Sequence, residues 1–172
     1  MAAPDLAAEA VRWLAHLVAE RRVSPHTLEA YARDLGQFLR FLATYNGEPP
    51  DLAALASLIP ADIRAFMAAR RNEGVESRSL ARILAGVRSF ARHLERAGKA
   101  KASAFSAVRA PKIARSLPKP LAPAAACDVA RGEGLDADKP QWVLARDTAV
   151  FGLLYGAGLR LSEALFLTRE IG

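Results

Sequence analysis

The segment from Glu76 to Ala97 constrains the fold more than any other part of the chain. Its apolar residues recur at steps of three and four, which is the period of an α-helix. At about 100° per residue they fall within about 60° of one direction. They are Leu80, Ile83, Leu84, Val87, Phe90, Ala91 and Leu94. The pattern predicts a helix that buries this stripe against other helices.

The opposite face of the same predicted helix is basic. It presents arginines around two small residues and no acidic side chain, in the order Arg78, Arg82, Ala85, Ser89, Arg92 and Arg96. Solvated helices usually mix charge signs so that i,i+4 pairs form, whereas like charges this close repel. A DNA groove explains the pattern, because arginines reach phosphates or guanine edges where small residues permit close approach. A merely solvated face is the alternative.

Three further helices precede this one. The first runs from about Asp5 to Arg21, and another follows Pro60 and ends near Gly74. Between them, Ser24-Pro25 supplies an N-cap with proline at the first helical position, and an apolar seam continues to Leu42. Alanine and leucine outnumber β-branched residues, which favours helices over strands. We therefore expect an all-α fold, with residues 1–98 forming a four-helix DNA-binding domain.

The positive charge of the chain is concentrated at its centre. Residues 60–120 carry 14 Lys and Arg against 4 Asp and Glu, whereas residues 1–59 and 121–172 each carry 5 against 7. Charge gathered in this way predicts a polyanionic partner. Residues 99–120 contain prolines, no acidic residue and several cations, including Lys112 and Lys119. This segment is interpreted as an extended basic linker, either following the DNA backbone or simply joining two domains.

Residues 121–172 begin another helical unit. Helices are predicted for Ala122–Arg131, for Gln141–Tyr155 with Trp142 facing inward, and for Leu161–Leu167. Cys127 is the only cysteine, so an internal disulfide and a cysteine-based metal cage are excluded. No apolar run approaches the roughly 20 residues that span a bilayer, and no export signal is present, so we expect a bacterial cytoplasmic protein without a membrane partner.

The sharpest motif is YGAGLRLSEAL, residues 155–165, in which Arg160 falls at the start of a helix. Cations are disfavoured at that end of the helix dipole, so the position points to a functional site. One interpretation is a phosphate clamp, in which Arg160 and helix-terminal N–H groups donate to the same anion. The alternative is an ion pair with Glu163 or with a carboxylate elsewhere.

This motif resembles the first catalytic-arginine box of the tyrosine recombinase (phage-integrase-like) family, and within it the Xer subgroup. Further stretches resemble the family in the same order, namely VSPHTLEAYARDLGQFLRF, SRSLARILAGVRSFARHL, APKIARSLPKPL and ARDTAVFGLLYGAGLR. The resemblance implies a SAM-like four-helix core-binding domain, an interdomain linker, and in residues 121–172 the first helices of a truncated catalytic domain.

The resemblance also implies a mechanism. In the family, a tyrosine attacks the scissile phosphate and forms a 3′-phosphotyrosyl link, and no metal or nucleotide cofactor is needed. Arg160 would be the first catalytic arginine, supported by Glu163. The lysine hairpin, the later histidines and the nucleophile have no counterpart after Arg160. We therefore expect this chain to bind DNA without cleaving it.

The implied partner is double-stranded DNA at a short palindrome-like recombination site. The parent protein is expected to act with a second Xer-type recombinase in a tetramer and with a DNA translocase. His26 and Thr27, in the first turn of the second helix, are further candidate phosphate contacts, with Ser24 as a cap rather than a contact.

Two other functions stay open on the sequence alone. One is a non-catalytic helical DNA-binding protein or regulator derived from a recombinase, and the other is an RNA-binding helical module. His93-Leu-Glu-Arg96 matches a His-x-x-Arg box in spelling only, because it precedes Arg160 and lies on the basic helix. Tyr31, Tyr45 and Tyr155 are interpreted as packing residues rather than nucleophiles.

Overall fold

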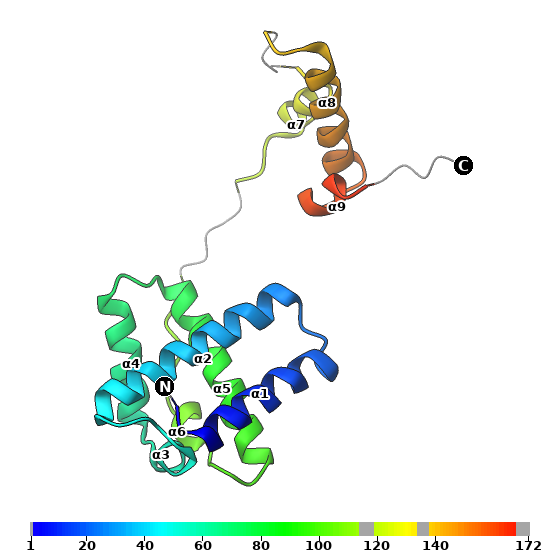
Figure 1. The fold of residues 1–172 in the computed structure, drawn as a ribbon. Helices are drawn as coiled ribbons and strands as arrows, with labels where there is room; N and C mark the ends of the chain where they lie inside the picture. The colour runs from blue at the N-terminus through cyan, green and yellow to red at the C-terminus, as the bar shows by residue number, and fades with distance from the viewer. Residues whose placement is uncertain (1, 114–118, 134–137, 168–172) are drawn as a thin grey trace. The chain divides into compact units, whose positions relative to one another are not determined.

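The computed structural model describes residues 2–113, 119–133 and 138–167, and every regular element in these ranges is a helix. The all-α prediction is confirmed. The chain divides into two compact units, residues 1–114 and 115–172 (Figure 1). Parts of the predicted linker (114–118) lie outside the described residues. No helix within the described ranges has the length and apolarity needed to cross a membrane.

Six helices build the first unit. They are α1 (Pro4–Ala19), α2 (Pro25–Asn46), α3 (Leu52–Ser57), α4 (Pro60–Asn72), α5 (Ser77–Arg96) and α6 (Ser103–Ser106). The predicted Ser24 cap is confirmed, since its hydroxyl accepts a hydrogen bond from the Thr27 amide at 3.2 Å. Gly47 ends α2 in the left-handed region at φ 79°, which suits a residue without Cβ. The sequence pattern missed α3 and α6, which are too short to show a period.

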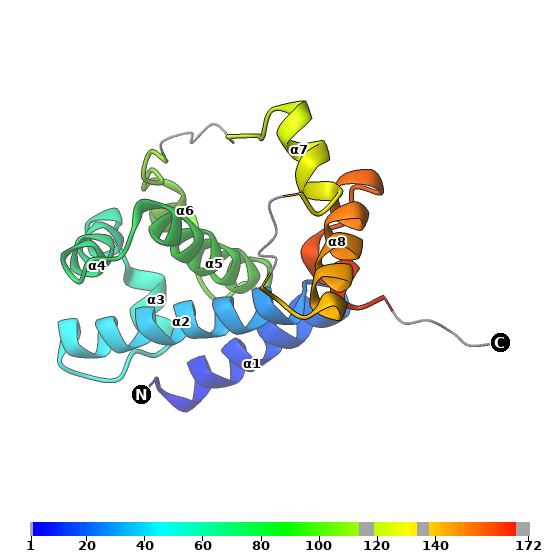
Figure 2. The same cartoon turned by 90° about the horizontal axis from the view of Figure 1, so that it is seen from above.

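Helix α5 is the centre of this unit, because it packs against α1, α2, α4 and α6 (Figures 1 and 2). Its whole predicted apolar stripe is buried. The largest buried side chains around it are aromatic, with Trp13 tilted against Phe90 at 5.4 Å between ring centroids. Burying one such ring contributes about 2–3 kcal/mol, so this stripe dominates the stability of the unit.

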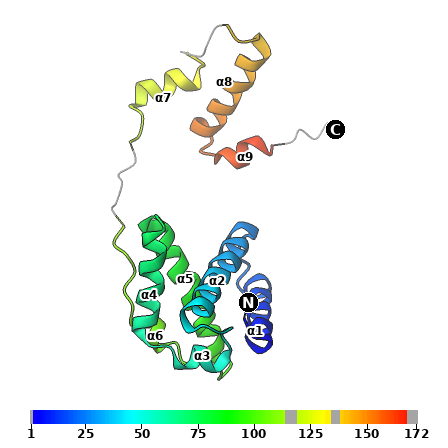
Figure 3. The same cartoon turned by 60° about the vertical axis from the view of Figure 1, so that its left-hand side comes forward.

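The start of the predicted linker belongs to the core instead. Four of its residues are buried, namely Ala102, Ala104, Phe105 and Val108. The centroid of the Phe105 ring lies 5.9 Å from that of Phe38. Figure 3 shows the chain running back along α4 after α6, where Val108 and Pro111 share a hollow with α4 side chains. The interpretation of residues 99–108 as extended linker was wrong. A short apolar cluster inside a basic stretch has no periodicity, so its burial was not visible in the sequence.

A buried carboxylate ties α1 to the C-terminal end of α5. Glu9 is 2% exposed and accepts a hydrogen bond from Lys99 Nζ at 2.6 Å, and it also pairs with Arg12. The His93 ring lies 3.8 Å from Glu9, measured Nε2 to Oε2, and 5.7 Å from the His16 ring. The Lys99 hydrogen bond lowers the pKa of Glu9 below its ordinary value of 4.5.

We expect the first unit to lose stability as the pH falls below about 6.5. Burial, reinforced by His16, Arg96 and Lys99, lowers the pKa of His93 below its ordinary value of 6.5, although Glu9 opposes the shift. The unfolded chain then binds the proton more readily, so protonation favours unfolding by at most about 1.4 kcal/mol per pH unit. Urea unfolding of the chain between pH 7.5 and 5 measures the effect. His93→Gln should flatten the dependence in this window; an unchanged slope in that variant would assign the effect to another group.

The second unit contains α7 (Pro123–Ala130), α8 (Gln141–Gly156) and α9 (Leu161–Leu165), and α8 packs against both others. Trp142 was predicted to face inward, but it is 67% exposed and lies beside Arg146, whose guanidinium is 5.6 Å from the ring centroid. The prediction was wrong because polar and apolar residues are mixed around α8, with Gln141, Arg146 and Asp147 on different sides, so periodicity does not identify its buried side. Tyr155 is half exposed and lies 3.7 Å from the Cys127 sulfur.

Candidate nucleic-acid interface

The predicted basic face of α5 borders a hollow of the first unit. This hollow has a volume of about 560 Å³ and lies where α1 and the start of α2 approach α5. Its lining residues are His16, Leu17, Arg21, Val23, Tyr31, Ala85, Arg88, Ser89, Arg92, Glu95 and Arg96. Four of the six residues of the predicted face therefore line one concave surface, to which the turn after α1 adds Arg21.

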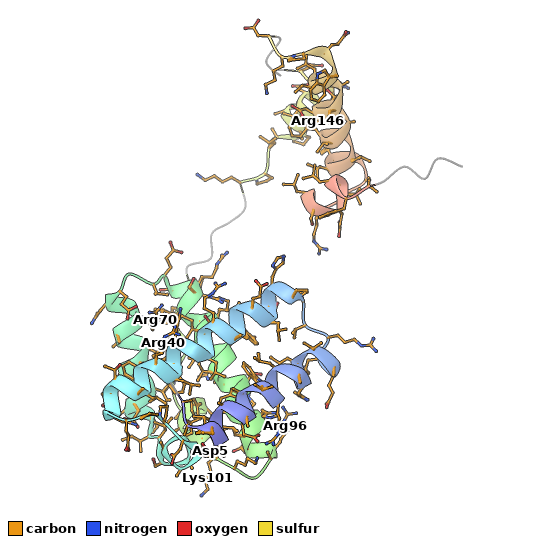
Figure 4. All side chains as sticks on the ribbon, viewed as in Figure 1. Asp5, Arg40, Arg70, Arg96, Lys101 and Arg146 are labelled. Carbon is orange, nitrogen blue, oxygen red and sulfur yellow. The ribbon has the colours of Figure 1, made fainter. Side chains whose placement is uncertain are left out.

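Several cations at this hollow are available to a ligand. Arg92 is exposed and makes no ion pair within the described part of the chain, and the same holds for Arg21. Arg96 reaches toward α1, where its Nη2 lies 3.5 Å from His16 Nε2, and its Nε donates to the Arg92 carbonyl at 3.3 Å (Figure 4). Glu95 is the only acidic lining residue among those described. The hollow is positively charged, which suits phosphates.

Close packing forms the floor of the hollow. The buried Trp13 donates its indole N–H to Ser89 Oγ at 3.3 Å, and its ring stacks on Tyr31 with the planes 8° apart. Tyr31 in turn covers Gly86, where a Cβ would lie 3.2 Å from the Tyr31 ring, so α2 and α5 meet closely there. Ser89 thus has a structural partner on its oxygen. Its hydroxyl group can still donate its own hydrogen to DNA, as the predicted contact requires.

Arg82 differs from the other arginines of the face. Its Nη1 lies 3.0 Å from Oδ2 of Asp34, a residue of α2 that is 1% exposed. The sequence analysis found no acidic residue to pair with these arginines on α5, but Arg82 has an acidic partner in the structure. The acidic partner comes from another helix, so the pattern of α5 alone gave no sign of it.

Arg88 is a structural residue that the sequence interpretation missed. Its Nε donates to the Phe105 carbonyl at 2.9 Å, and its Nη2 donates to the carbonyl of Val108. These bonds satisfy carbonyls at the C-terminal end of α6, which have no partner within the helix. Arg88 therefore fastens the residues after α6 to the helix that carries the basic face.

The remaining predicted DNA contacts lie in several places. Arg78 is exposed in the first turn of α5, and His26 is exposed at the start of α2, while Thr27 is partly buried within the Ser24 cap. Lys112 is exposed in the first unit, and Lys119 is exposed in the second. Neither lysine lines the hollow. Within the first unit the structure brings together Ala85, Ser89, Arg92 and Arg96 at the hollow, whereas Arg78, His26, Thr27 and Lys112 do not line it.

Arg160 is the N-cap residue of α9 and is largely exposed, with 84% of its side chain accessible. Its amide donates to Glu163 Oε2 at 2.8 Å, and its guanidinium donates to Glu163 Oε1 at 3.2 Å. Glu163 thus orients Arg160, which fits the supporting role that the resemblance implies. The structure contains this ion pair, and the exposed guanidinium still has free N–H donors.

No group of three metal-ligating side chains occurs in the described residues. His93 and Arg96 lie on α5, with His93 packed toward Glu9. The surroundings of Tyr31, stacked on Trp13, are those of a packing residue.

Comparison with known proteins identifies the first unit. Residues 10–98 match the family described as "Phage integrase, N-terminal SAM-like domain". The chain belongs to this family. The SAM-like four-helix prediction is confirmed, with α3 and α6 as additions to it.

The chain is similar over nearly its whole length to proteins named tyrosine recombinase XerC. It is 57% identical to that of Methylobacterium nodulans, over 99% of this chain and 53% of the relative. It is 56% identical to that of Bradyrhizobium diazoefficiens, over 97% of this chain and 52% of the relative. The chain spans about half the length of the curated relatives it matches. The resemblance to Xer recombinases is confirmed.

Proposed function

We propose that this chain is the DNA-binding portion of a site-specific tyrosine recombinase. The observation that carries the proposal is the 560 Å³ hollow, which is lined by Arg21, Arg92 and Arg96. A duplex placed against α5 would meet these cations with its phosphates, while Ala85 leaves room for close approach. The names of the relatives support recombination as the reaction of the whole protein.

Arg160 has a defined role in this proposal. In strand exchange by this family a tyrosine replaces the 5′-oxygen at a phosphate, and negative charge builds on the phosphate oxygens. The exposed guanidinium of Arg160, oriented by Glu163 at 3.2 Å, would donate to those oxygens. Residues 161–172 contain no tyrosine, lysine or histidine, so the other catalytic groups would come from elsewhere in the whole protein.

The partners and the setting of the reaction belong to the same proposal. The substrate would be a short palindrome-like site in duplex DNA, because paired recombinase subunits need paired half-sites. A second Xer-type recombinase, completing a tetramer, and a DNA translocase are the proposed protein partners. The cytoplasm is the proposed location.

Binding to labelled duplexes tests this function. We expect the 172-residue chain to bind a 30-base-pair DNA duplex at low ionic strength, with affinity falling linearly as salt rises on a log–log plot. Duplex RNA of the same length should compete poorly. On a nicked suicide duplex the chain should form no denaturation-resistant adduct, since its tyrosines are not placed as nucleophiles. Failure to bind duplex DNA at low salt would overturn the proposal, and an adduct would overturn the tyrosine assignment.

A further inference from the structure

The ion pair between Asp34 and Arg82 is hard to explain by stability alone. Asp34 is 1% exposed, and its carboxylate lies between α2 and α5 with Arg82 Nη1 at 3.0 Å. The contact has the distance of an ion pair but not the angle of a good hydrogen bond, because Oδ2 has no hydrogen-bond partner. Removing a carboxylate from water is costly, and an apolar pair of similar volume is often as stable. A buried acid at this position therefore indicates a role beyond packing.

The electrostatics of the site agree with that cost. Burial raises the pKa of Asp34 above its ordinary value of 3.8, while Arg82, Arg33 and Arg70 oppose the shift. The side chain of Arg82, by contrast, is 40% exposed. One end of its guanidinium is held from inside the protein, and the rest is presented to solvent on the same face of α5 as Ala85 and Ser89.

The arginines of the α5 face thus fall into two kinds. Arg92 and Arg96 have no carboxylate partner among the described residues, so their charge is not offset by an acid, which suits phosphate contacts. Arg82 is restrained by the Asp34 carboxylate 3.0 Å away, which also offsets much of its charge. A held guanidinium adds little general attraction to DNA, but its planar fork is aligned for bidentate recognition of one partner.

We propose that Asp34 is a positioning residue that orients Arg82 to read a base edge in the major groove, with guanine as the base. This inference rests on the proposed function. Guanine follows from chemistry, because its O6 and N7 accept the two parallel N–H groups of an arginine fork. Asp34 acts through Arg82 and does not itself contact DNA. Sequence preference then depends on this pair, whereas overall affinity depends on Arg92 and Arg96.

Asp34→Asn tests the proposal, because it removes the charge and keeps the shape. Wild-type chain is first used to select duplexes from a pool with randomised base pairs, and affinities for a selected and a scrambled duplex are then measured. We expect D34N to reduce the ratio of these affinities about tenfold or more, as for a lost bidentate base contact. Affinity for the scrambled duplex should stay unchanged or rise, because a negative charge is removed.

Three variants serve as controls. Glu29→Gln on α2 makes the same change in net charge at an exposed site and should leave the ratio unchanged. Arg92→Ala should lower both affinities by the same factor. In an Arg82→Ala background, D34N should cause no further loss in the ratio, which a merely structural role of Asp34 would not produce.

The outcomes separate this inference from the function on which it rests. If the wild-type chain ignores duplex DNA at low salt, the proposed function fails. If it binds but selects no sequence, or if folded D34N keeps the wild-type ratio, only the positioning role of Asp34 fails. Should D34N not fold, Arg82→Lys decides, because lysine keeps the ion pair without the fork. A wild-type ratio in R82K would overturn the inference.

Discussion

Replacing Arg92 and Arg96 together with alanine is expected to weaken duplex binding about 60-fold at 0.1 M salt. Each phosphate contact contributes about 0.9 to the slope of log affinity against log salt, so two lost contacts lower the slope by about 1.8. Counterion release contributes little at 1 M salt, so the two proteins should bind about equally there. Over the tenfold range from 1 M down to 0.1 M, a slope difference of about 1.8 amounts to a difference in affinity of about 60-fold. Both side chains line the hollow beside α5 and make no ion pair with an acidic residue in the described ranges. Anisotropy titrations of a labelled duplex at several salt concentrations measure both quantities.

Arg64 and Arg71 provide a matched control for this variant. They are exposed on α4, and neither lines the hollow. Their double replacement with alanine makes the same change in net charge, so it should reproduce any general electrostatic effect but not the loss of specific contacts. If the control variant loses as much affinity and salt dependence as R92A/R96A, the DNA interface does not lie on the basic face of α5.

The long helices and the basic face were predictable from the sequence because both are periodic. The stripe from Leu80 to Leu94 requires a helix, and its burial in the structure is complete. Arginines on the opposite side then follow from the geometry of a helix. Ser24 was predictable as a cap because the signal is local, a hydroxyl residue directly before proline.

What the sequence did not reveal depends on contacts between distant residues. Asp34 and Arg82 are paired only because α2 and α5 pack together, and a pattern within one helix carries no information about its neighbour. The same holds for Trp13, whose indole N–H meets Ser89 across the α1–α5 contact. Such pairs determine which arginines have a partner within the protein and which do not. The residues of the basic face were therefore predictable, but their partners were not.

Residues 99–108 show the opposite error, in which local composition misled. Lysines, small residues and the absence of acids resemble a solvated linker, yet Phe105 is 2% exposed and Val108 is 6% exposed. Arg88 adds to this anchoring by donating to both of their carbonyls. A single buried aromatic residue in a charged segment gives a weak sequence signal, although it contributes strongly to the core.

Phe105→Ala is therefore expected to lower the free energy of unfolding of the first unit by about 3–5 kcal/mol, the usual cost of truncating a buried phenylalanine. The ring contacts Phe38 edge-on at 5.9 Å and lies within the core cluster. Because a domain of this size is stabilised by only about 5–15 kcal/mol, the variant should unfold at much lower urea concentration. Urea unfolding followed by circular dichroism measures the difference.

Ile113→Ala is the companion measurement, because Ile113 is apolar, follows the same segment and is 45% exposed. Its truncation should change the free energy of unfolding by less than about 0.5 kcal/mol. Equal stability of the two variants would mean that residues 99–108 are not part of the core and belong to the linker after all. If the large difference is observed, a structural change near Phe105 is expected to affect α5 as well, because Arg88 of α5 donates to the carbonyls of Phe105 and Val108. The connection between the two units would then begin after Val108, held against the helix that is proposed to contact DNA.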